Sequence, residues 1–268
     1  MLRAKLSVVC ALSLAVAAFM LAGCSTVTED KTAAWSPEKI YAEATEEMKA
    51  GAFDRAVTLF EKLEGRAAGT PLAQQAQLDK AYVHYKSGDL ALAIATLDRF
   101  MKLHPASPAF DYALYLKGII NFNDDLGLFS AITRQDLAER DQKAAKESFE
   151  SFKELVSRFP NSRYAPEATL RMTYIVNSLA QYEVHVARYY FARAAYVAAI
   201  NRAQVTVADY QGAPATEEAL FILVKSYDAL ALPQLRDDAK RVLEKNFPAT
   251  EYLTRGFKDN SDPWWKVW

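Results

Sequence analysis

The sequence predicts an all-α protein built from repeated helix pairs. Apolar residues recur at helical spacing along most of the chain, as Ala56, Leu59, Phe60 and Leu63 do. Strand signals are weak. Glycine is rare, with 9 in 268 residues, and several glycines stand where one periodic segment stops and the next begins. Those glycines are Gly51, Gly65, Gly69 and Gly88.

The stops between helices share a sequence pattern. Three of them read LHPAS at 103–107, RFPNS at 158–162 and NFPAT at 246–250. Thr70-Pro71 and Ala213-Pro214 occupy like positions, and the spacings along Thr70, Ser107, Ser162, Ala213 and Thr250 are 37, 55, 51 and 37 residues. A two-helix unit that recurs about every 34 to 37 residues is the signature of tetratricopeptide (TPR) repeats. The sequence therefore predicts a TPR-type α-solenoid of five helix-turn-helix repeats with a concave face.

The first two repeats match the TPR pattern best. Ser36 and Pro37 are typical of a helix N-cap and first turn, so the first helix is expected to begin there. Ala44 and Ala81 are small residues at equivalent positions, which allows the paired helices to approach closely. Other residues at pattern positions are Gly51, Phe53, Ala56, Phe60, Leu63, Gly88, Asp89, Leu90, Ala93, Leu97, Phe100 and Pro105.

The third and fourth repeats are enlarged. The third is expected to hold a helix at about 108–123, a loop that runs to about residue 140, and a helix at 141–158. In the fourth, an extra helix at about 180–193 is expected before a helix at 195–209. The two enlargements distinguish this chain from a plain TPR array.

These elements define the expected domain organisation. Residues 36–163 form an N-terminal TPR half with repeats one to three, and residues 164–250 form a C-terminal half with repeats four and five. A Trp-rich tail follows at 251–268. The interpretations of the tail remain open: a cap that folds back over the last apolar helix, a disordered end, or a contact with a membrane interface or a partner, where Trp is favoured.

The N-terminus has the features of an export signal. Arg3 and Lys5 precede an apolar run at 6–20 that is too short to span a bilayer as a helix. The run ends in LAGC at 21–24, which looks like a lipobox, with small residues beside the scissile bond. We therefore expect residues 1–23 to be a cleaved lipoprotein signal peptide. The alternatives are an ordinary signal peptide and an N-terminal transmembrane anchor.

Cys24 is the predicted lipidation site. Its thiol is the nucleophile that accepts a diacylglycerol group, and an N-acyl chain would follow, because stable anchoring needs more than one chain. Residues 24–35 would then be an acylated tether. Ser25 resembles the residue that permits sorting to the outer membrane. We expect a lipid anchor on the periplasmic face of the outer membrane and no other cofactor.

Composition excludes several classes of function. The signal holds two of the 32 basic residues and none of the 33 acidic ones, which leaves the mature chain a formal charge of −3. Nucleic-acid binding would require a basic surface. His84, His104 and His185 form no metal-binding pair, and Asp124-Asp125 is most simply a turn. No catalytic motif is present, so the sequence predicts neither an enzyme nor a metal site.

The first helices of a TPR solenoid line its concave face, and tyrosines recur there in this chain. Tyrosine offers apolar area and a hydrogen-bonding tip, which suits peptide recognition. The alternative is that several of these residues pack between neighbouring repeats. The projected groove residues are Tyr41, Tyr82, Tyr85, Lys86, Tyr112, Tyr115 and Phe122, with Thr45, Met48, Lys49, Leu78 and Ile119 beside them.

Several longer stretches carry a resemblance to a known family. They are DKAYVHYK at 79–86, DYALYLKG at 111–118, LAQYE at 179–183, VARYY at 186–190 and AINR at 199–202. With the enlarged third and fourth repeats, they resemble the BamD lipoproteins of the outer-membrane β-barrel assembly (Bam) machinery, called ComL-type competence lipoproteins in some bacteria. The resemblance covers about residues 34–250.

The resemblance implies a non-catalytic adaptor. Its expected partners are the periplasmic POTRA domains of BamA, the smaller lipoproteins BamC and BamE, unfolded outer membrane proteins and outer membrane lipid. Arg202 and Asn201 match the family's Asn-Arg motif in the BamA-docking half, and Arg188 lies in a matching stretch. The N-terminal groove would receive the aromatic-ended signal of unfolded barrel proteins. The open alternatives are a pilotin-like TPR lipoprotein for secretin or pilus assembly and a cell-wall enzyme or its regulator.

Overall fold

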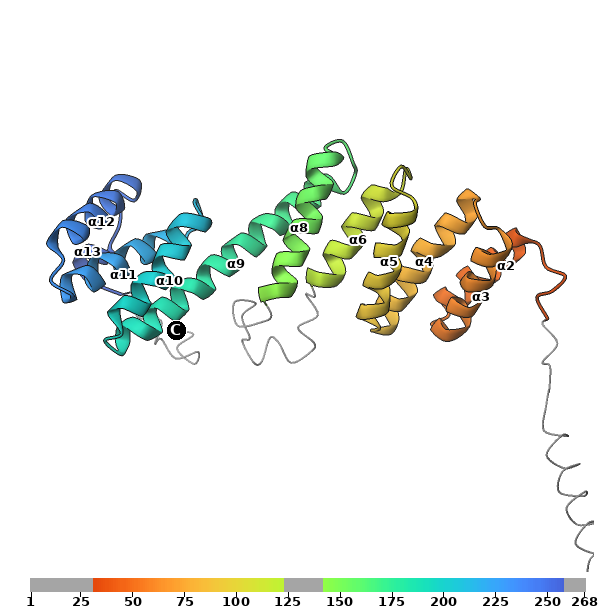
Figure 1. Cartoon of the computed structure of the whole chain (residues 1–268), viewed down its shortest axis with the longest axis horizontal. Coiled ribbons are helices and arrows are strands. Elements are labelled where there is room, and N and C mark those ends of the chain that lie inside the picture. Colours follow the sequence, from red (N-terminus) through yellow and green to blue (C-terminus); the bar gives the residue numbers. More distant parts are fainter. Residues whose placement is uncertain (1–30, 123–141, 258–268) are drawn as a thin grey trace, which may run out of the picture.

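The structure is a computed structural model that describes residues 31–122 and 142–257, and every regular element in those residues is an α-helix. In the described residues the helices form five successive pairs, which follow one another along an elongated molecule (Figure 1). The pairs are α2 (Pro37–Lys49) with α3 (Phe53–Arg66), α4 (Pro71–Ser87) with α5 (Leu90–Leu103), α6 (Phe110–Phe122) with α8 (Gln142–Arg158), α9 (Ala165–Ala192) with α10 (Tyr196–Asp209), and α11 (Thr216–Ala229) with α12 (Pro233–Asn246); the short α13 (Tyr252–Arg255) follows.

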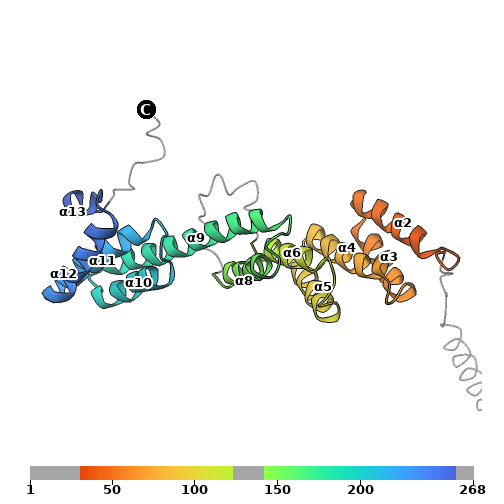
Figure 2. The same cartoon turned by 90° about the horizontal axis from the view of Figure 1, so that it is seen from above.

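Each helix packs mainly against the helices next to it in sequence, and each first helix also meets the first helix of a neighbouring pair. The apolar core is accordingly divided into four clusters that follow one another along the chain. The view from above shows the same serial stacking (Figure 2). A stack in which each unit contacts only its neighbours is a solenoid, so the predicted TPR-type fold of five helix pairs is confirmed.

The predicted start of the first helix has the expected cap, and α4 begins in a similar way. The side chain of Ser36 accepts a hydrogen bond from the N–H of Lys39 at 3.3 Å, and Pro37 occupies the first turn. Thr70 caps α4 in the same way, through the N–H of Ala73 at 3.2 Å. Capping by Ser or Thr satisfies an N–H that the helix itself leaves without a partner.

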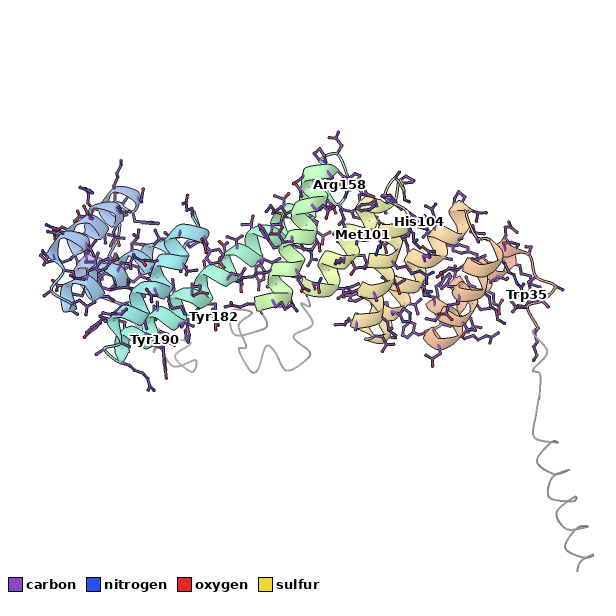
Figure 3. The ribbon with its side chains drawn as sticks, in the orientation of Figure 1. Trp35, Met101, His104, Arg158, Tyr182 and Tyr190 are labelled. Atoms are coloured by element: carbon purple, nitrogen blue, oxygen red, sulfur yellow. The ribbon has the colours of Figure 1, made fainter. Side chains whose placement is uncertain are left out.

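The recurring stops form the same turn. The N–H groups of His104, Phe159 and Phe247 each bond to the carbonyl four residues earlier, which completes the last helical turn. The N–H of Ser107 then bonds to the carbonyl of His104 at 3.0 Å, and Ser162 bonds to Phe159 at 2.9 Å. His104 and Arg158 mark two of these turns on one edge of the molecule (Figure 3). The sequence pattern that the three stops share therefore corresponds to one backbone geometry.

Helix α9 differs from the prediction of a separate helix at 180–193. It is one continuous helix of 28 residues, because no glycine or proline interrupts the chain after Pro166. Its first half packs in the core that contains Phe152, and its second half packs in the core that contains Ile222. The expected division at residue 164 falls where α9 begins, and half of α9 completes the core of repeat three.

The third repeat depends on a close contact between α6 and α8. Gly118 is buried, and a Cβ there would lie 2.7 Å from Phe152 Cδ1. The buried hydroxyl of Ser148 donates a hydrogen bond to the carbonyl of Gly118 at 2.8 Å. Gly118 thus occupies the small position that Ala44 and Ala81 occupy in the first two repeats, where both alanines are fully buried.

Several predictions concern residues outside the described ranges. They include the signal peptide, Cys24, most of the tether, Asp124-Asp125 and the tail from residue 258. Within residues 31–122 and 142–257, no helix has the length and hydropathy that a membrane crossing requires. The same residues contain no cluster of three or more His, Cys, Asp and Glu side chains suited to a metal ion.

Candidate functional site

The exposed faces of α2, α4, α6 and α9 form the candidate site, which we call the concave groove. It begins with a contact between the first two repeats, where the hydroxyl of Tyr41 on α2 donates to Asp79 Oδ2 on α4 at 2.8 Å. Burial, together with this bond to Asp79, raises the pKa of Tyr41 to about 12. Burial also raises the pKa of Asp79, although Tyr41 and Gln75 both donate to it. The phenol and the carboxylate fix α2 against α4.

A hollow of about 440 Å³ opens beside Asp79, between α4, α6 and the start of α9. Its walls combine tyrosine rings with charged groups. Asp111 is held in place at one wall, because it accepts a bond of 2.7 Å from the hydroxyl of Ser162. The lining residues are Gln75, Leu78, Asp79, Pro108, Ala109, Asp111, Tyr112, Arg163 and Tyr164. A cavity of this size admits a few side chains of an extended segment.

Three tyrosine rings adjoin this hollow. Tyr164 stacks on Tyr115 with ring centroids 4.6 Å apart and lies 5.7 Å from Tyr112. The hydroxyl of Tyr115 donates to Glu167 Oε2 at 2.7 Å, which connects α6 with the first turn of α9. Burial, then Glu167, raises the pKa of Tyr115 to about 12. The tyrosines are therefore half-buried, with their rings packed and their edges accessible.

The structure brings together five of the seven projected groove residues as partly exposed tyrosines. Tyr82 and Tyr85 lie side by side on α4 with ring centroids 6.3 Å apart, and Lys86 next to them is exposed. The partly exposed tyrosines are Tyr41, Tyr82, Tyr85, Tyr112 and Tyr115. These tyrosines also contact the cores of the first three repeats, so each contributes both to core packing and to the exposed surface.

Phe122 does not line the groove, although it was projected onto the exposed face. It is 5% exposed, because α9 runs past the end of α6 and covers it. The ring of Tyr174 lies 5.7 Å from the ring of Phe122, and the guanidinium of Arg171 lies 5.0 Å from it. Leu78, projected beside the groove, is also buried, at 1% exposed, although it borders the 440 Å³ hollow. Both corrections follow from the neighbouring first helix, which a single-helix projection ignores.

Sequence reasoning missed the part of the groove that α9 contributes. Glu167, Leu170 and Tyr174 stand at the same offsets from Ser162 as Tyr112, Tyr115 and Ile119 stand from Ser107. Leu170 is 72% exposed and Tyr174 is 48% exposed. Carrying the repeat register one unit further would have found all three. Tyr164, which precedes the helix, had no such signal.

The predicted docking residues lie on the C-terminal half, where Arg202 and Arg188 pair with different acidic residues. Arg202 on α10 is half-exposed and pairs with the buried Glu183 of α9 at 3.1 Å. Asn201 beside it is exposed. Arg188 on α9 instead donates through Nε to Glu218 Oε1 on α11 at 2.6 Å. Asn201 is therefore presented to solvent, whereas Arg202 and Arg188 each pair with a buried carboxylate, and Arg202 is the more exposed of the two arginines.

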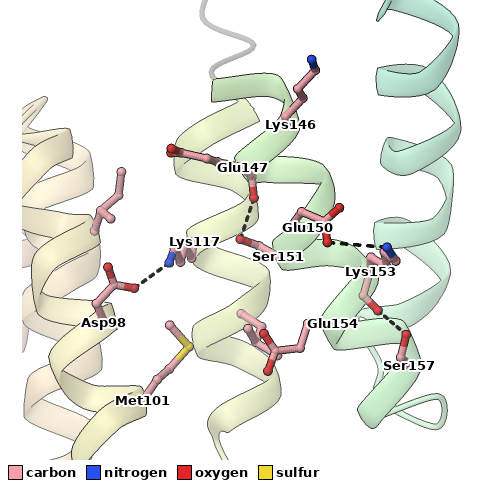
Figure 4. A pocket seen from close by; sticks show the side chains of 12 residues that line it. Asp98, Met101, Lys117, Lys146, Glu147, Glu150, Ser151, Lys153, Glu154 and Ser157 are labelled. Atoms are coloured by element: carbon pink, nitrogen blue, oxygen red, sulfur yellow. Dashed lines mark hydrogen bonds and ion pairs between the residues drawn. The ribbon is translucent and has the colours of Figure 1, made fainter. Parts of the chain in front are cut away.

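A larger hollow of about 660 Å³ lies on another side, between α5, α6 and α8 (Figure 4). Lys117 reaches Asp98 there at 2.6 Å. Lys80, one repeat earlier, makes the equivalent contact with Glu61 and a closer one with Glu64. These ion pairs bind α4 to α3 and α6 to α5. We infer that these ion pairs help to fix how successive repeats are aligned against one another.

The serial helix pairs and the tyrosine-lined groove define the class of protein as a TPR-type binding protein. A family model described as YfiO, outer membrane lipoprotein, matches residues 33–243. The chain is also 46% identical to the outer membrane protein assembly factor BamD of Neisseria meningitidis serogroup A, over 92% of this chain and 95% of that protein. The chain belongs to this family of outer membrane lipoproteins.

Two further relatives have the same name. The BamD of Neisseria gonorrhoeae is 44% identical over 98% of this chain and 99% of its own length. The BamD of Vibrio cholerae is 34% identical over 85% of this chain and 94% of its own length. Each is named an outer membrane protein assembly factor, which favours the assembly interpretation over the pilotin and cell-wall alternatives.

Proposed function

We propose that this chain is a periplasmic adaptor of the Bam complex, in which it binds BamA and helps to recognise and insert unfolded outer membrane proteins. The main support is that relatives named as BamD assembly factors match the chain over nearly its full length. A binding role is also what a solenoid with a tyrosine-lined groove can perform, because it offers a long surface. No step of this function requires catalysis by the chain.

The anchor in this proposal is Cys24, with a diacylglycerol group and an N-acyl chain. Residues 24–35 connect it to α2, and twelve extended residues reach at most about 40 Å. The solenoid would therefore stay close to the periplasmic surface of the outer membrane. BamC and BamE are proposed as further partners, on the basis of the family resemblance.

The client site is proposed to be the concave groove. Tyr82, Tyr85 and Lys86 line one part of it, and Tyr112, Tyr115 and Tyr41 continue it. An extended, aromatic-ended segment would pack its rings against the half-buried tyrosines and bond its backbone to their hydroxyls. From the structure we add Tyr164, Leu170 and Tyr174, and we omit Phe122.

The BamA site is proposed to lie on α10. Arg202 is already oriented by the buried carboxylate of Glu183, so little rotamer freedom is lost when a POTRA carboxylate binds to it. Asn201 beside it is exposed and offers an amide to the same partner. Arg188 is engaged with Glu218 and would contribute only through that pairing.

The test is affinity purification of the full lipoprotein from membranes, with mass spectrometry of what is recovered. BamA is expected as the major partner. Recovery of a secretin or a cell-wall synthase in its place would contradict the proposal. A Cys24→Ala variant is the matched control for anchoring, because it should lose membrane association and leave the soluble solenoid folded.

A further inference from the structure

Residues 251–257, which we call the C-terminal segment, return from α12 and lie on α11 and α9. Tyr252 is buried, and its ring stacks on Phe221 of α11 with centroids 5.3 Å apart. Its hydroxyl donates to Glu218 Oε2 at 3.1 Å. The segment thus begins with an aromatic anchor whose polar tip reaches a buried carboxylate.

A second aromatic anchor follows five residues later. The ring of Phe257 lies 5.0 Å from that of Phe221 and 5.3 Å from that of Phe191. The guanidinium of Arg188 lies 5.6 Å from the same ring, within the range of a cation–π contact. Phe191 is on α9 and Phe221 is on α11, so Phe257 bridges the first helices of repeats four and five.

The acceptor of this contact occupies a repeated position. Glu218 stands at the same offset from Ala213 as Glu167 stands from Ser162, and each lies in the first turn of its helix. Glu167 accepts the hydroxyl of Tyr115, which comes from the preceding first helix. Glu218 accepts the hydroxyl of Tyr252, which comes from the end of the chain. The acid at this repeat position therefore accepts a tyrosine hydroxyl in both repeats. For Glu167 the tyrosine belongs to the preceding first helix, and for Glu218 it belongs to the C-terminal segment.

The C-terminal segment has little regular structure of its own. Its helix α13 has four residues, which is far too short to be stable without tertiary packing. The Pro248-Ala249 turn separates the segment from α12. Its attachment includes two aromatic anchors, one hydroxyl and the partly buried Leu253, in the manner of a bound peptide.

We propose that the first helices of repeats four and five form a second peptide-binding groove, which residues 252–257 occupy in cis. The ligand class is a short segment with a tyrosine and a phenylalanine five positions apart. The tyrosine hydroxyl is bound by Glu218, and the phenylalanine lies between Phe191, Phe221 and Arg188. This site is distinct from the proposed client groove and does not depend on that proposal.

The test is competition between the attached segment and the same sequence in trans. The probe is a fluorescein-labelled peptide of residues 250–258, TEYLTRGFK. The full mature chain is compared with its Tyr252→Ala/Phe257→Ala variant by fluorescence anisotropy. An attached ligand has an effective concentration of roughly a millimolar, so the peptide should bind the variant at least about tenfold more tightly than the wild type.

Control variants and peptides distinguish binding at this site from nonspecific binding of an aromatic peptide. A Tyr189→Ala variant removes an exposed aromatic ring of α9 that belongs to neither proposed groove, and it should bind like the wild type. Peptides with the tyrosine changed to phenylalanine, or the phenylalanine to alanine, should bind the double variant more weakly. Equal binding to wild type and variant, or equal binding of all three peptides, would overturn the proposal.

Folding of the variant is checked by its melting temperature. If it unfolds, the same comparison is made with Tyr252→Phe, which removes only the hydroxyl. That variant should then bind the peptide more tightly than the wild type does. An absence of binding to every folded variant would equally overturn the proposal.

Discussion

Two stretches of the same surface differ in what covers them. The concave groove over α4, α6 and the start of α9 contains an open hollow of about 440 Å³. Over α9 and α11, the corresponding surface is covered by the C-terminal segment. The equivalent acids reflect this contrast, since the side chain of Glu167 is 47% exposed and that of Glu218 is 8% exposed.

The difference indicates how one repeat can serve two purposes. The first helices provide the same elements in both stretches, namely aromatic rings and an acid in the first turn. In the open stretch the rings pack on one another and keep an accessible edge. In the covered stretch the rings of the first helices pack against the aromatic residues of the C-terminal segment. The N-terminal stretch thus keeps an open hollow, and the C-terminal stretch is covered by residues of the chain itself.

The largest effect is expected from Glu218→Ala. The change removes the acceptor that Arg188 and Tyr252 share, and it should lower the free energy of unfolding by about 2 to 3 kcal/mol, below the range for a fully buried pair because Arg188 is partly exposed. Urea unfolding measures this. Glu217→Ala, the neighbouring change, should have little effect. If both variants lose equal stability, the covered stretch has no special dependence on Glu218.

Gly118→Ala should disturb the frame of the open stretch. The added Cβ meets the ring of Phe152 and would push α6, which carries Tyr112 and Tyr115, away from α8. A loss of about 1 to 3 kcal/mol is expected from overpacking. Gly65→Ala is the control, because nothing lies near its Cβ position and it sits within α3. That control should be neutral or slightly stabilising, whereas destabilisation by both would attribute the effect to helix backbone alone.

Tyr82→Ala combined with Tyr115→Ala should affect binding in the open stretch alone. Crosslinking to a barrel C-terminal peptide is expected to fall about tenfold, since aromatic anchors often carry this much binding energy. Tyr189→Ala, on an exposed tyrosine of the C-terminal half, should leave crosslinking unchanged. Unchanged crosslinking in the double variant would reject the groove assignment.

Arg202→Glu should act on the C-terminal half. Co-purification of BamA is expected to fall several-fold, because a charge-assisted bond is replaced by repulsion. Arg241→Glu is a matched charge reversal at a more exposed arginine on α12 and should preserve recovery. Circular dichroism tests whether the new carboxylate beside Glu183 perturbs the fold. Full recovery of BamA with Arg202→Glu would show that BamA does not dock at Arg202.

The smallest effect is expected from Asp79→Asn. Burial raises the pKa of Asp79, so the stability linked to this group is present at low pH and is lost as the pH rises through the raised pKa. The variant should therefore gain less than about 1 kcal/mol at pH 7, and the gain should vanish at about pH 3. Urea unfolding at the two pH values checks this, with the exposed Asp54→Asn as control.

Local features made the fold predictable, and long-range contacts limited prediction of the site. The turns at 103–107 and 158–162 are sequence patterns with one backbone geometry, so the repeat count and phase could be read directly. The burial of Phe122 could not, because it depends on how far α9 extends beyond α6. The engagement of Arg188 with Glu218 joins residues 30 positions apart on different helices, which no local pattern records.

Helix α9 has a mechanical consequence. At about 1.5 Å per residue, its 28 residues form a rod of about 42 Å that is embedded in two cores at once. If one core tilts it by about 10°, its far end moves by about 7 Å. A tilt at the end of α9 that carries Arg188 would therefore move the end that carries Leu170 by a distance comparable to the spacing of alternate side chains in an extended peptide.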